Sequence, residues 1–378
     1  MRFFSSISSR IKMASLPETF KALQILPELK GIKVVQIPSA SLVKDLPEDQ
    51  LVIRVRAAGL NPTDWRHVLG RLGTAGTIAG CDAAGEVVEV GPAVKHLKVG
   101  DRAGGFTFGG SHQTENGAYS EYVRLVSAAC FKLPEAMTYE EAASFPIPHF
   151  TAVQALYHRL NFPKPFSPNP KRESIVIWGG SSAVGHHAVQ LAALSGLKVF
   201  VTASPDVHDE LKALGAEACF DYKDADVAKK ILAAAGEEDI LYGLDTRCEK
   251  GSTDALDVMS PSRGGRIIAI GYVSGETKQR RKDVQIDLII VFSELGFPFN
   301  YGHMMDFPAI PADKSATLEY VTTDMPRILE NWKAGQGSPK FKTQRLRHLQ
   351  GGLENIQEGL EIMKEGNYAR EKLVYTIA

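Results

Sequence analysis

The chain has 378 residues, more than one domain usually holds, so at least two domains are predicted. Hydrophobic residues make up 44% and charged residues 23%, as in ordinary globular proteins, and the formal net charge of -1 argues against nucleic acid or an acidic membrane surface as a partner. No uninterrupted run of about 20 apolar residues exists, so we expect no membrane-spanning helix.

The four cysteines, Cys81, Cys130, Cys219 and Cys248, are far apart and form no CxxC pair. A structural zinc site requires thiolates at short spacing, and a disulfide framework is typical of short, cysteine-dense secreted chains. We therefore predict four free thiols in a reducing compartment and expect a cytoplasmic protein.

Residues 1–17 form a basic, serine-rich segment. Its charged residues are Arg2, Arg10 and Lys12, and it contains five serines and no acidic residue. This composition resembles a mitochondrial presequence. The alternative is a disordered tail, with Met13 as a second start site.

The N-terminal third carries short strands separated by glycine turns. Residues 50–57 (QLVIRVRA) alternate apolar and charged side chains, as expected of a strand with one buried face, and residues 85–91 (GEVVEVG) repeat the pattern. Further strands are predicted at 20–25, 33–37 and 118–124, with a turn at 99–101. Such strands predict a small, partly open β-barrel.

Helices follow the predicted barrel. Thr138 is a suitable N-cap for a short helix that ends at Ser144, because two glutamates stand in its first turn. A second helix is predicted at 151–159, and four prolines between 162 and 171 indicate an exposed connection.

From residue 174 the pattern alternates between buried strands and helices. Strands are predicted at 174–178, 198–202, 218–222, 240–245 and 266–271, and helices at 183–194, 208–214, 226–235 and 253–260. Units of this length predict a parallel sheet with right-handed crossovers, which is a doubly wound α/β fold. After residue 310 helices are predicted at 318–332 and 351–365, and a final strand at 372–377 can return to the first domain.

The motif Gly180-x-Ser182-x-x-Gly185 lies between a predicted buried strand and a predicted helix. It matches the GxGxxG fingerprint of dinucleotide-binding Rossmann domains, with serine in the second glycine position. A small residue there lets the backbone approach a pyrophosphate, and the helix N-terminus points N–H groups at that anion. We therefore predict a nicotinamide-dinucleotide site in which Ser181 and Ser182 add hydroxyl donors. The alternative is a glycine turn needed only for packing.

The end of the second strand of this region favours NADPH over NADH. An acidic residue there would bind the ribose 2′-hydroxyl of NAD, and residues 201–204 end the strand without one. Ser204 can bond a 2′-phosphate, and Tyr222 can cover it. Asp206 is the argument for NADH, because a carboxylate beside the phosphate would repel it.

No metal is predicted in the site. Catalytic zinc in dehydrogenases is held by Cys and His side chains and polarises an alcohol or carbonyl oxygen. The corresponding positions carry Asn61-Pro62-Thr63 and Cys81-Asp82, which is one thiol without a histidine. Alcohol oxidation is therefore disfavoured. Hydride addition to an alkene conjugated with a carbonyl is favoured, because hydrogen bonds suffice to hold the enolate that forms.

Three histidines lie near the predicted junction of the domains. His149 is a candidate general acid, because a cleft forms at such a junction. The alternative is a histidine that only lines or caps the cleft. His186 and His187 open the helix that follows the glycine motif and are interpreted as structural.

Taken together, these motifs resemble the zinc-free, quinone-oxidoreductase-like branch of the medium-chain dehydrogenase/reductase family. The resemblance covers residues 20–378 and is greatest to the fungal trans-acting enoyl reductases of polyketide synthases. Its marks are Leu60-Asn-Pro-Thr-Asp-Trp65, Gly80-Cys-Asp82 with Gly85, Val99-Gly-Asp101, Gly179-Gly-Ser-Ser182, Ser204-Pro205, Phe220-Asp-Tyr222 and Glu371-Lys-Leu-Val374.

The resemblance implies a GroES-like β-barrel catalytic domain and a Rossmann domain that binds NADPH. It divides the chain into the tail or presequence 1–17, the GroES-like domain 18–145, the Rossmann domain 146–310 and a return to the catalytic domain at 311–378. It implies cofactor contacts by Thr63, Asp64, Trp65, Gly180, Ser181, Ser182, Ala183, Val184, Gly185, Ser204, Pro205, Tyr222, Ile270, Gly271 and Lys372. It implies a substrate cleft lined by Ser144, Phe145, Pro146, Ile147, Pro148, His149, Phe150, Thr151, Ile290, Val291, Phe292 and Ser293.

Two stretches depart from the family pattern. Asp206 and Val207 stand where the related fungal enzymes tend to have polar residues, which weakens the prediction of NADPH. Mitochondrial enoyl reductases and quinone reductases carry a tyrosine shortly after the Asn-Pro segment that can donate a proton, but the comparable stretch here is Gly70-Arg-Leu-Gly73. The protonating group is therefore unassigned; Thr63 and His149 are the candidate catalytic residues, and water is an alternative.

The leading hypothesis is an NADPH-dependent reductase of an enoyl or enone. The substrate would be a small molecule or an acyl chain borne by a carrier, with a polyketide synthase as one partner considered. A quinone reductase is the first alternative and shares every cofactor residue. A non-catalytic NADPH-binding redox sensor is the second. Both a monomer and a homodimer are compatible with the resemblance.

Overall fold

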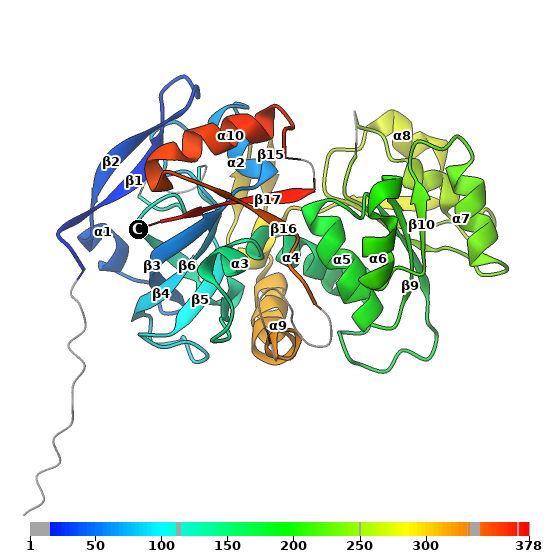
Figure 1. Cartoon of the computed structure of the whole chain (residues 1–378), viewed down its shortest axis with the longest axis horizontal. Coiled ribbons are helices and arrows are strands. Elements are labelled where there is room, and N and C mark those ends of the chain that lie inside the picture. Colours follow the sequence, from blue (N-terminus) through cyan, green and yellow to red (C-terminus); the bar gives the residue numbers. More distant parts are fainter. Residues whose placement is uncertain are drawn as a thin grey trace, which may run out of the picture.

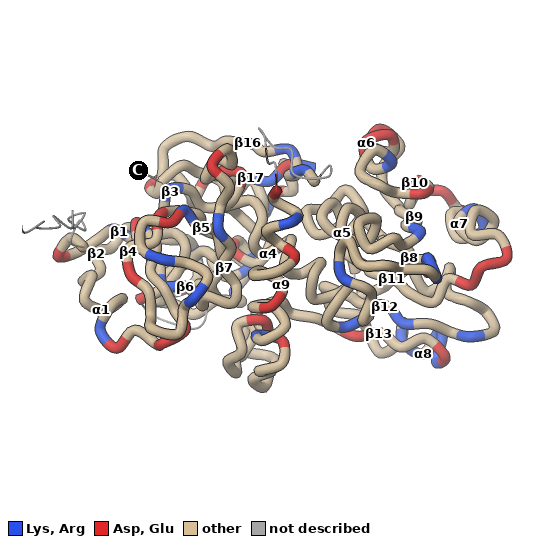
Figure 2. Tube along the Cα trace, turned by 90° about the horizontal axis from the view of Figure 1, so that it is seen from below, with Lys and Arg blue, Asp and Glu red and all other residues tan. Residues whose placement is uncertain are grey.

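The computed structural model describes residues 16–110, 115–248, 251–330, 332, 341–368 and 370–377. The predicted tail or presequence, 1–17, therefore lies outside the described residues except for its last two. Two β-sheet bodies stand side by side, with helix α9 (Pro311–Leu329) between them (Figure 1). Lys and Arg are interleaved with Asp and Glu along both bodies (Figure 2). Among the described residues, no helix is long and apolar enough to cross a membrane.

The first body is a partly closed barrel built around strand β3 (Gln50–Gly59). One end of β3 pairs with β6 and the other with the C-terminal strand β17, and the sheet runs in the order β16-β17-β3-β4-β5-β7. Its other strands are β4 (Asp82–Val90), β5 (Arg102–Phe106), β6 (Tyr122–Val126), β7 (Cys130–Lys132), β16 (Arg345–Leu349) and β17 (Glu371–Thr376). The predicted hairpin forms a separate sheet of β1 (Thr19–Ile25) and β2 (Ile32–Pro38). The last strand of the chain thus completes the first body.

The second body is a six-stranded parallel sheet in the order β10-β9-β8-β11-β12-β13. This is the order of the doubly wound Rossmann fold. The strands are β8 (Ser174–Trp178), β9 (Lys198–Ala203), β10 (Ala218–Asp221), β11 (Tyr242–Asp245), β12 (Gly265–Ala269) and β13 (Val284–Leu288). The predicted α/β class is confirmed.

Alternate residues of β8 enter two different cores, which shows that both faces of the parallel sheet are covered. Ile175 and Ile177 pack with helix α5 (Ala183–Leu194), while Val176 and Trp178 pack with α7 (Val227–Ala235) and the 3₁₀ turn at Asp254–Val258. Side chains of a strand point alternately to opposite faces, so a continuous apolar run such as SIVIW is required here.

The remaining helices are α1 (Ala40–Val43), α2 (Pro62–Val68), α3 (Tyr139–Ala143), α4 (Pro146–Val153), α6 (His208–Ala213), α8 (Gly275–Arg280) and α10 (Ile356–Lys364). Thr138 caps α3 as predicted, because its hydroxyl accepts from the Glu141 N–H at 3.1 Å. A short antiparallel hairpin, β14 (Phe299–Tyr301) and β15 (Met305–Phe307), follows the parallel sheet.

Several predicted elements differ from the observed ones, among them the helix predicted at 318–332, which spans Pro311–Leu329. The helix predicted at 151–159 begins five residues earlier, at Pro146, and its last part is π-helical. Pro146 and Pro148 stand in the first turn of this helix. The N–H groups of a first turn have no hydrogen-bond partner within the helix, so prolines are tolerated there. The helix predicted at 253–260 is only the 3₁₀ turn at Asp254–Val258, and the strand predicted from 118 begins at Tyr122.

Candidate active site

The turn between β8 and α5 contains three glycines at positions that leave no room for a side chain. A Cβ on Gly179, whose φ is +90°, would lie 2.6 Å from Thr246 Oγ1, and one on Gly180 would lie 2.1 Å from Val201 Cγ1. A Cβ on Gly185 would lie 2.3 Å from the Gly179 carbonyl oxygen. Contacts this short exclude any side chain, so backbone and helix approach each other as closely as a bound pyrophosphate requires.

Ser182 is the N-cap of α5. Its Oγ accepts from the Gly185 N–H at 3.0 Å and donates to Thr246 Oγ1 at 2.9 Å. The Ser182 hydroxyl therefore stabilises the turn, and its role as a donor to the cofactor stays a prediction. The N–H groups of the first turn, at Ala183 and Val184, still point at the site, as helix N-termini do toward anions.

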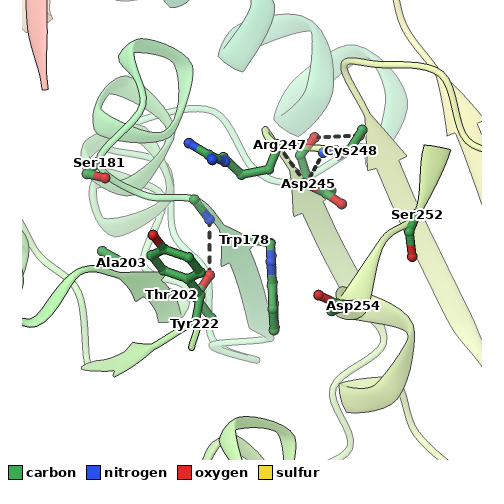
Figure 3. Close-up of a pocket in the computed structure, with 11 residues that line it drawn as sticks. Trp178, Ser181, Thr202, Ala203, Tyr222, Asp245, Arg247, Cys248, Ser252 and Asp254 are labelled. Carbon is green, nitrogen blue, oxygen red and sulfur yellow. Dashed lines mark hydrogen bonds between the residues drawn. The ribbon is translucent and has the colours of Figure 1, made fainter. Parts of the chain in front are cut away.

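A first cavity lies on one side of this turn, at the carboxyl ends of β8, β9 and β11. Figure 3 shows Tyr222 and Trp178 in it, with the Arg247 side chain extending toward Ser181. The Arg247 chain also lies over Gly179, whose added Cβ would meet Arg247 Cγ at 2.7 Å. Asp245 Oδ1 accepts from the Arg247 N–H at 2.7 Å and holds this loop in place.

A second, larger cleft of about 800 Å³ lies on the other side of the turn, between the two bodies. Residues of the α5 N-terminus form one wall, α2 contributes Pro62, Thr63 and Arg66, and the far wall is apolar. The apolar wall consists of Ile147, Pro148, Ile270, Ile289, Ile290, Val291, Phe292 and Tyr301. The two cavities thus flank one glycine turn, which suits a ligand with two nucleotide ends.

The structure brings only some of the predicted site residues to these cavities. Those that line them are Thr63, Ile147, Pro148, Thr151, Ser181, Ser182, Ala183, Val184, Tyr222, Ile270, Ile290, Val291 and Phe292. Those that line neither cavity are Asp64, Trp65, Ser144, Phe145, Pro146, His149, Phe150, Gly180, Gly185, Ser204, Pro205, Gly271, Ser293 and Lys372. Ser204 and Pro205 follow Ala203, which does line the first cavity.

Helical geometry explains most of the residues that miss the cleft. The substrate wall was predicted as the continuous stretch 144–151, but a helix turns about 100° per residue, so α4 can present only one face. That face carries Ile147, Pro148 and Thr151, at spacings of one and four residues. Phe145 and Phe150 are fully buried in the core instead.

His149 is completely buried, and both ring nitrogens have partners. Nε2 lies 2.8 Å from Tyr320 Oη and Nδ1 lies 3.1 Å from His187 Nδ1. Burial lowers the pKa of His149 to about 3, so the ring is neutral at physiological pH. The interpretation of His149 as a general acid is therefore wrong. The His149 side chain packs from α4 against α5 and α9.

Several residues that line the cavities were not predicted from the sequence. In the first cavity these include Arg247 and Asp245, and in the cleft they include Arg66, Thr246 and Tyr301. Asp245 ends β11 and Arg247 follows it, and the carboxyl ends of parallel strands are where ligands bind, so this position was a usable signal. Nothing local marks Tyr301, because its hairpin lies outside the parallel sheet.

A buried ionic network lies behind Asn61, which lines the cleft. Lys372 Nζ donates to Asn61 Oδ1 at 2.6 Å and to Asp82 Oδ2 at 3.0 Å, and Asn61 Nδ2 donates to the same Asp82 oxygen at 2.8 Å. Asp82 Oδ1 accepts from the Ile147 N–H at 2.9 Å, in the first turn of α4. Lys372 was predicted to contact the cofactor, but it instead joins β17, β4, α2 and α4.

No described residues form a group of three or more His, Cys, Asp or Glu side chains that could hold a metal ion. At Asn61, the side-chain amide that would have to bind a metal is already hydrogen-bonded to Asp82 and Lys372. Cys81 is buried in the apolar core, and burial raises the pKa of its thiol.

Thr63 is oriented by His67, one turn further along α2. Burial lowers the pKa of His67 to about 4, so its ring is neutral, and Nδ1 lies 3.0 Å from the Gly109 carbonyl oxygen. A carbonyl can only accept, so Nδ1 carries the proton and Nε2 is an acceptor. Nε2 lies 3.4 Å from Thr63 Oγ1, which therefore donates to it. Thr63 thus presents lone pairs to the cleft and is unsuited to be a proton donor.

Asp64 is a second buried carboxyl in this region, and it makes folding pH-dependent. Its Oδ2 accepts from the Asn61 N–H at 2.7 Å, and burial, together with the charge of Asp82, raises its pKa to about 6. A carboxyl with a raised folded-state pKa stabilises the fold when protonated, and that stability is lost as pH rises from about 4 to 6.

We expect Asp64→Asn to increase the free energy of unfolding at pH 7.5 by about 3 kcal/mol. Asparagine is neutral and keeps an oxygen that can accept from the Asn61 N–H. Near pH 4 wild type and variant should be nearly equal, because Asp64 is then protonated. Urea unfolding at both pH values measures this, and a difference that does not change with pH would contradict it.

The chain matches two family descriptions, "alcohol dehydrogenase GroES-like domain" over residues 47–135 and "zinc-binding dehydrogenase" over residues 183–302. Among curated proteins it is 33% identical to "Trans-enoyl reductase ACTTS2" of Alternaria alternata, over 91% of this chain and 98% of that protein. It is 31% identical to "Trans-enoyl reductase FSL5" of Gibberella zeae, over 97% and 99% of the two chains.

Solved structures share the fold. The CurK enoyl reductase has a TM-score of 0.67 at 19% identity, covering 96% of this chain and 100% of its own. A quinone oxidoreductase of Pseudomonas syringae pv. Tomato has a TM-score of 0.67 at 23% identity, covering 94% and 99%. The glycine turn, the α5 N-terminus and the two flanking cavities fit the nicotinamide dinucleotide that this family's Rossmann domain binds. The chain belongs to the medium-chain dehydrogenases/reductases, with fungal trans-enoyl reductases among its relatives, and is an NAD(P)-dependent oxidoreductase.

Proposed function

We propose that the protein reduces the carbon–carbon double bond of an enoyl or enone substrate, with hydride supplied by NADPH when it is bound. The observation that carries this proposal is the cleft itself. Its isoleucines and Phe292 line the cleft together with Thr63 and the α5 N-terminus, on one side of the glycine turn. An aliphatic chain suits that wall, and the similarity to trans-enoyl reductases supports the same chemistry.

The proposed preference for NADPH rests on the charges around the end of β9. Asp206, the residue that argued for NADH, is ion-paired with Arg370 from the segment before β17. The pair lowers the pKa of Asp206 through this hydrogen bond and compensates its charge. Arg247 and Tyr222 line the adjacent cavity, so cationic and aromatic groups surround the place of a 2′-phosphate.

The test combines cofactor and substrate. Purified protein is mixed with NADPH or NADH and with α,β-unsaturated thioesters, enones or quinones, and the loss of absorbance at 340 nm is followed. We expect alkene reduction with a KM for NADPH at least tenfold below that for NADH. Turnover of quinones alone would identify the protein as a quinone reductase. Tight NADPH binding without turnover of any substrate would favour a redox sensor instead.

We further propose that the natural substrate is an acyl chain carried by a separate synthase. The cleft is open to solvent beside Arg66, where an anionic carrier arm could approach. Comparing the same enoyl group on a short thiol and on an acyl carrier protein tests this. A higher kcat/KM for the short thioester would reject a carrier-borne substrate.

A further inference from the structure

Tyr301 brings a phenol into the cleft from a part of the chain far from the barrel. It ends β14, and its ring lines the cleft together with Thr63 and Arg66. The ring stacks on Phe108, with centroids 6.5 Å apart and planes inclined by 11°, and lies 5.9 Å from the His67 ring. These contacts hold the ring beside α2 at the cleft wall.

The β14–β15 hairpin is fixed against the barrel segment 72–74. His303 Nε2 lies 3.1 Å from the Gly73 carbonyl oxygen, and a Cβ on Gly302 would lie 3.0 Å from Leu72 Cδ2. A Cβ on Gly73 would lie 2.5 Å from the His67 carbonyl oxygen, so this barrel segment has no room for a side chain of its own there. Gly73 therefore supplies no side chain here, and Tyr301 lines the cleft beside this segment.

The other hydroxyls that line the cleft are already committed as donors. Thr151 donates to the Ile147 carbonyl at 2.6 Å, and Ser182 donates to Thr246. Thr246 lies 2.9 Å from the Gly179 carbonyl, to which it donates, and Thr63 donates to His67. Among the described residues, the Tyr301 hydroxyl has no hydrogen-bond partner, and a phenol is a far stronger acid than an alkanol. Arg66 is too basic to give up a proton.

We propose that Tyr301 is the general acid of alkene reduction, a role that rests on the proposed function. Hydride adds to the β-carbon, and the π electrons move to the carbonyl oxygen, which gives an enolate. The enolate carbonyl re-forms as the α-carbon takes the proton from Tyr301 Oη, so that one O–H bond breaks and one C–H bond forms. Solvent then reprotonates the phenolate. Arg66, which lines the same cleft, stabilises the negative charge on either oxygen.

The test compares Tyr301→Phe with Tyr122→Phe, a matched control whose ring packs on Phe20 in the barrel away from the cleft. Tyr301→Phe should lower kcat for an enoyl thioester about 100-fold and leave the Kd for NADPH and the melting temperature unchanged. Reduction of a quinone should change less than threefold, because water can protonate the hydroquinone oxygen. Tyr122→Phe should match wild type with both substrates.

Product stereochemistry gives a readout independent of rate. With an α-methyl enoyl thioester, wild type should protonate one face of the α-carbon and form one enantiomer, whereas Tyr301→Phe should give a nearly equal mixture. Unchanged kcat and enantiomer ratio in Tyr301→Phe would overturn the role of Tyr301, as would an equal loss with alkene and quinone. Failure of wild type to reduce any alkene would instead reject the proposed function, and the role of Tyr301 with it.

Discussion

Lys372→Met is expected to lower the free energy of unfolding by about 3–5 kcal/mol. The substitution leaves Asp82, which is fully buried, without the ammonium group that now lies 3.0 Å away. Removing one partner of a buried ion pair costs this much because the remaining charge is neither solvated nor compensated. Urea unfolding at neutral pH measures the loss.

Two further variants make this prediction specific. Adding Asp82→Asn to Lys372→Met should recover at least half of the lost stability, because asparagine needs no cation and still accepts from the Ile147 N–H. Lys229→Met breaks an ion pair with Asp226 that is largely exposed, and should change stability by less than about 1 kcal/mol. A loss below about 1 kcal/mol in Lys372→Met would show that the Lys372–Asp82–Asn61 network contributes little to the stability of the fold.

Gly185→Ala is expected to weaken NADPH binding by 100-fold or more, which corresponds to about 2.7 kcal/mol. The new Cβ would lie 2.3 Å from the Gly179 carbonyl oxygen and 2.7 Å from Gly180 Cα. Both are backbone atoms, so α5 must move away from the turn, and its N-terminal N–H groups move with it. Quenching of protein fluorescence during titration with NADPH gives the Kd.

Gly275→Ala serves as the matched control, since a Cβ at that position meets nothing within 4 Å and Gly275 has no positive φ. It should bind NADPH like wild type. Both variants should remain folded by circular dichroism, because alanine favours helices. NADPH binding by Gly185→Ala within threefold of wild type would be incompatible with a pyrophosphate seated on this turn.

Local sequence patterns were sufficient to predict the elements whose side chains follow a single helical or strand periodicity and a single pattern of burial. The buried run at β8, the glycine motif after it and the N-cap at Thr138 were all predicted and are present. Each is determined by residues within one turn or one strand. Strands β5 and β13 were missed. Gly104 and Gly105 interrupt the alternation in β5, whereas β13 (VQIDL) does alternate apolar and polar residues, so its pattern was a usable signal.

Residues expected in the site were predicted as continuous stretches, and the structure uses only one face of each. On α2, Thr63 reaches the cleft whereas Asp64 and Trp65 do not, and on α4 the same rotation turns His149 into the core. Sequence proximity to a motif therefore overestimates contact on helices. The domain division at residues 145 and 310 remains a prediction.

The sequence by itself determined the doubly wound class and the position of the glycine turn, because apolar period and glycine sterics act over a few residues. Only the tertiary structure decided which side chains meet in the cleft. Lys372 reaches Asp82 across 290 residues, Arg370 reaches Asp206 across 164, and Tyr301 reaches α2 through a hairpin anchored on Gly73. Such pairs form because chain closure brings distant segments together, and no local pattern encodes that approach.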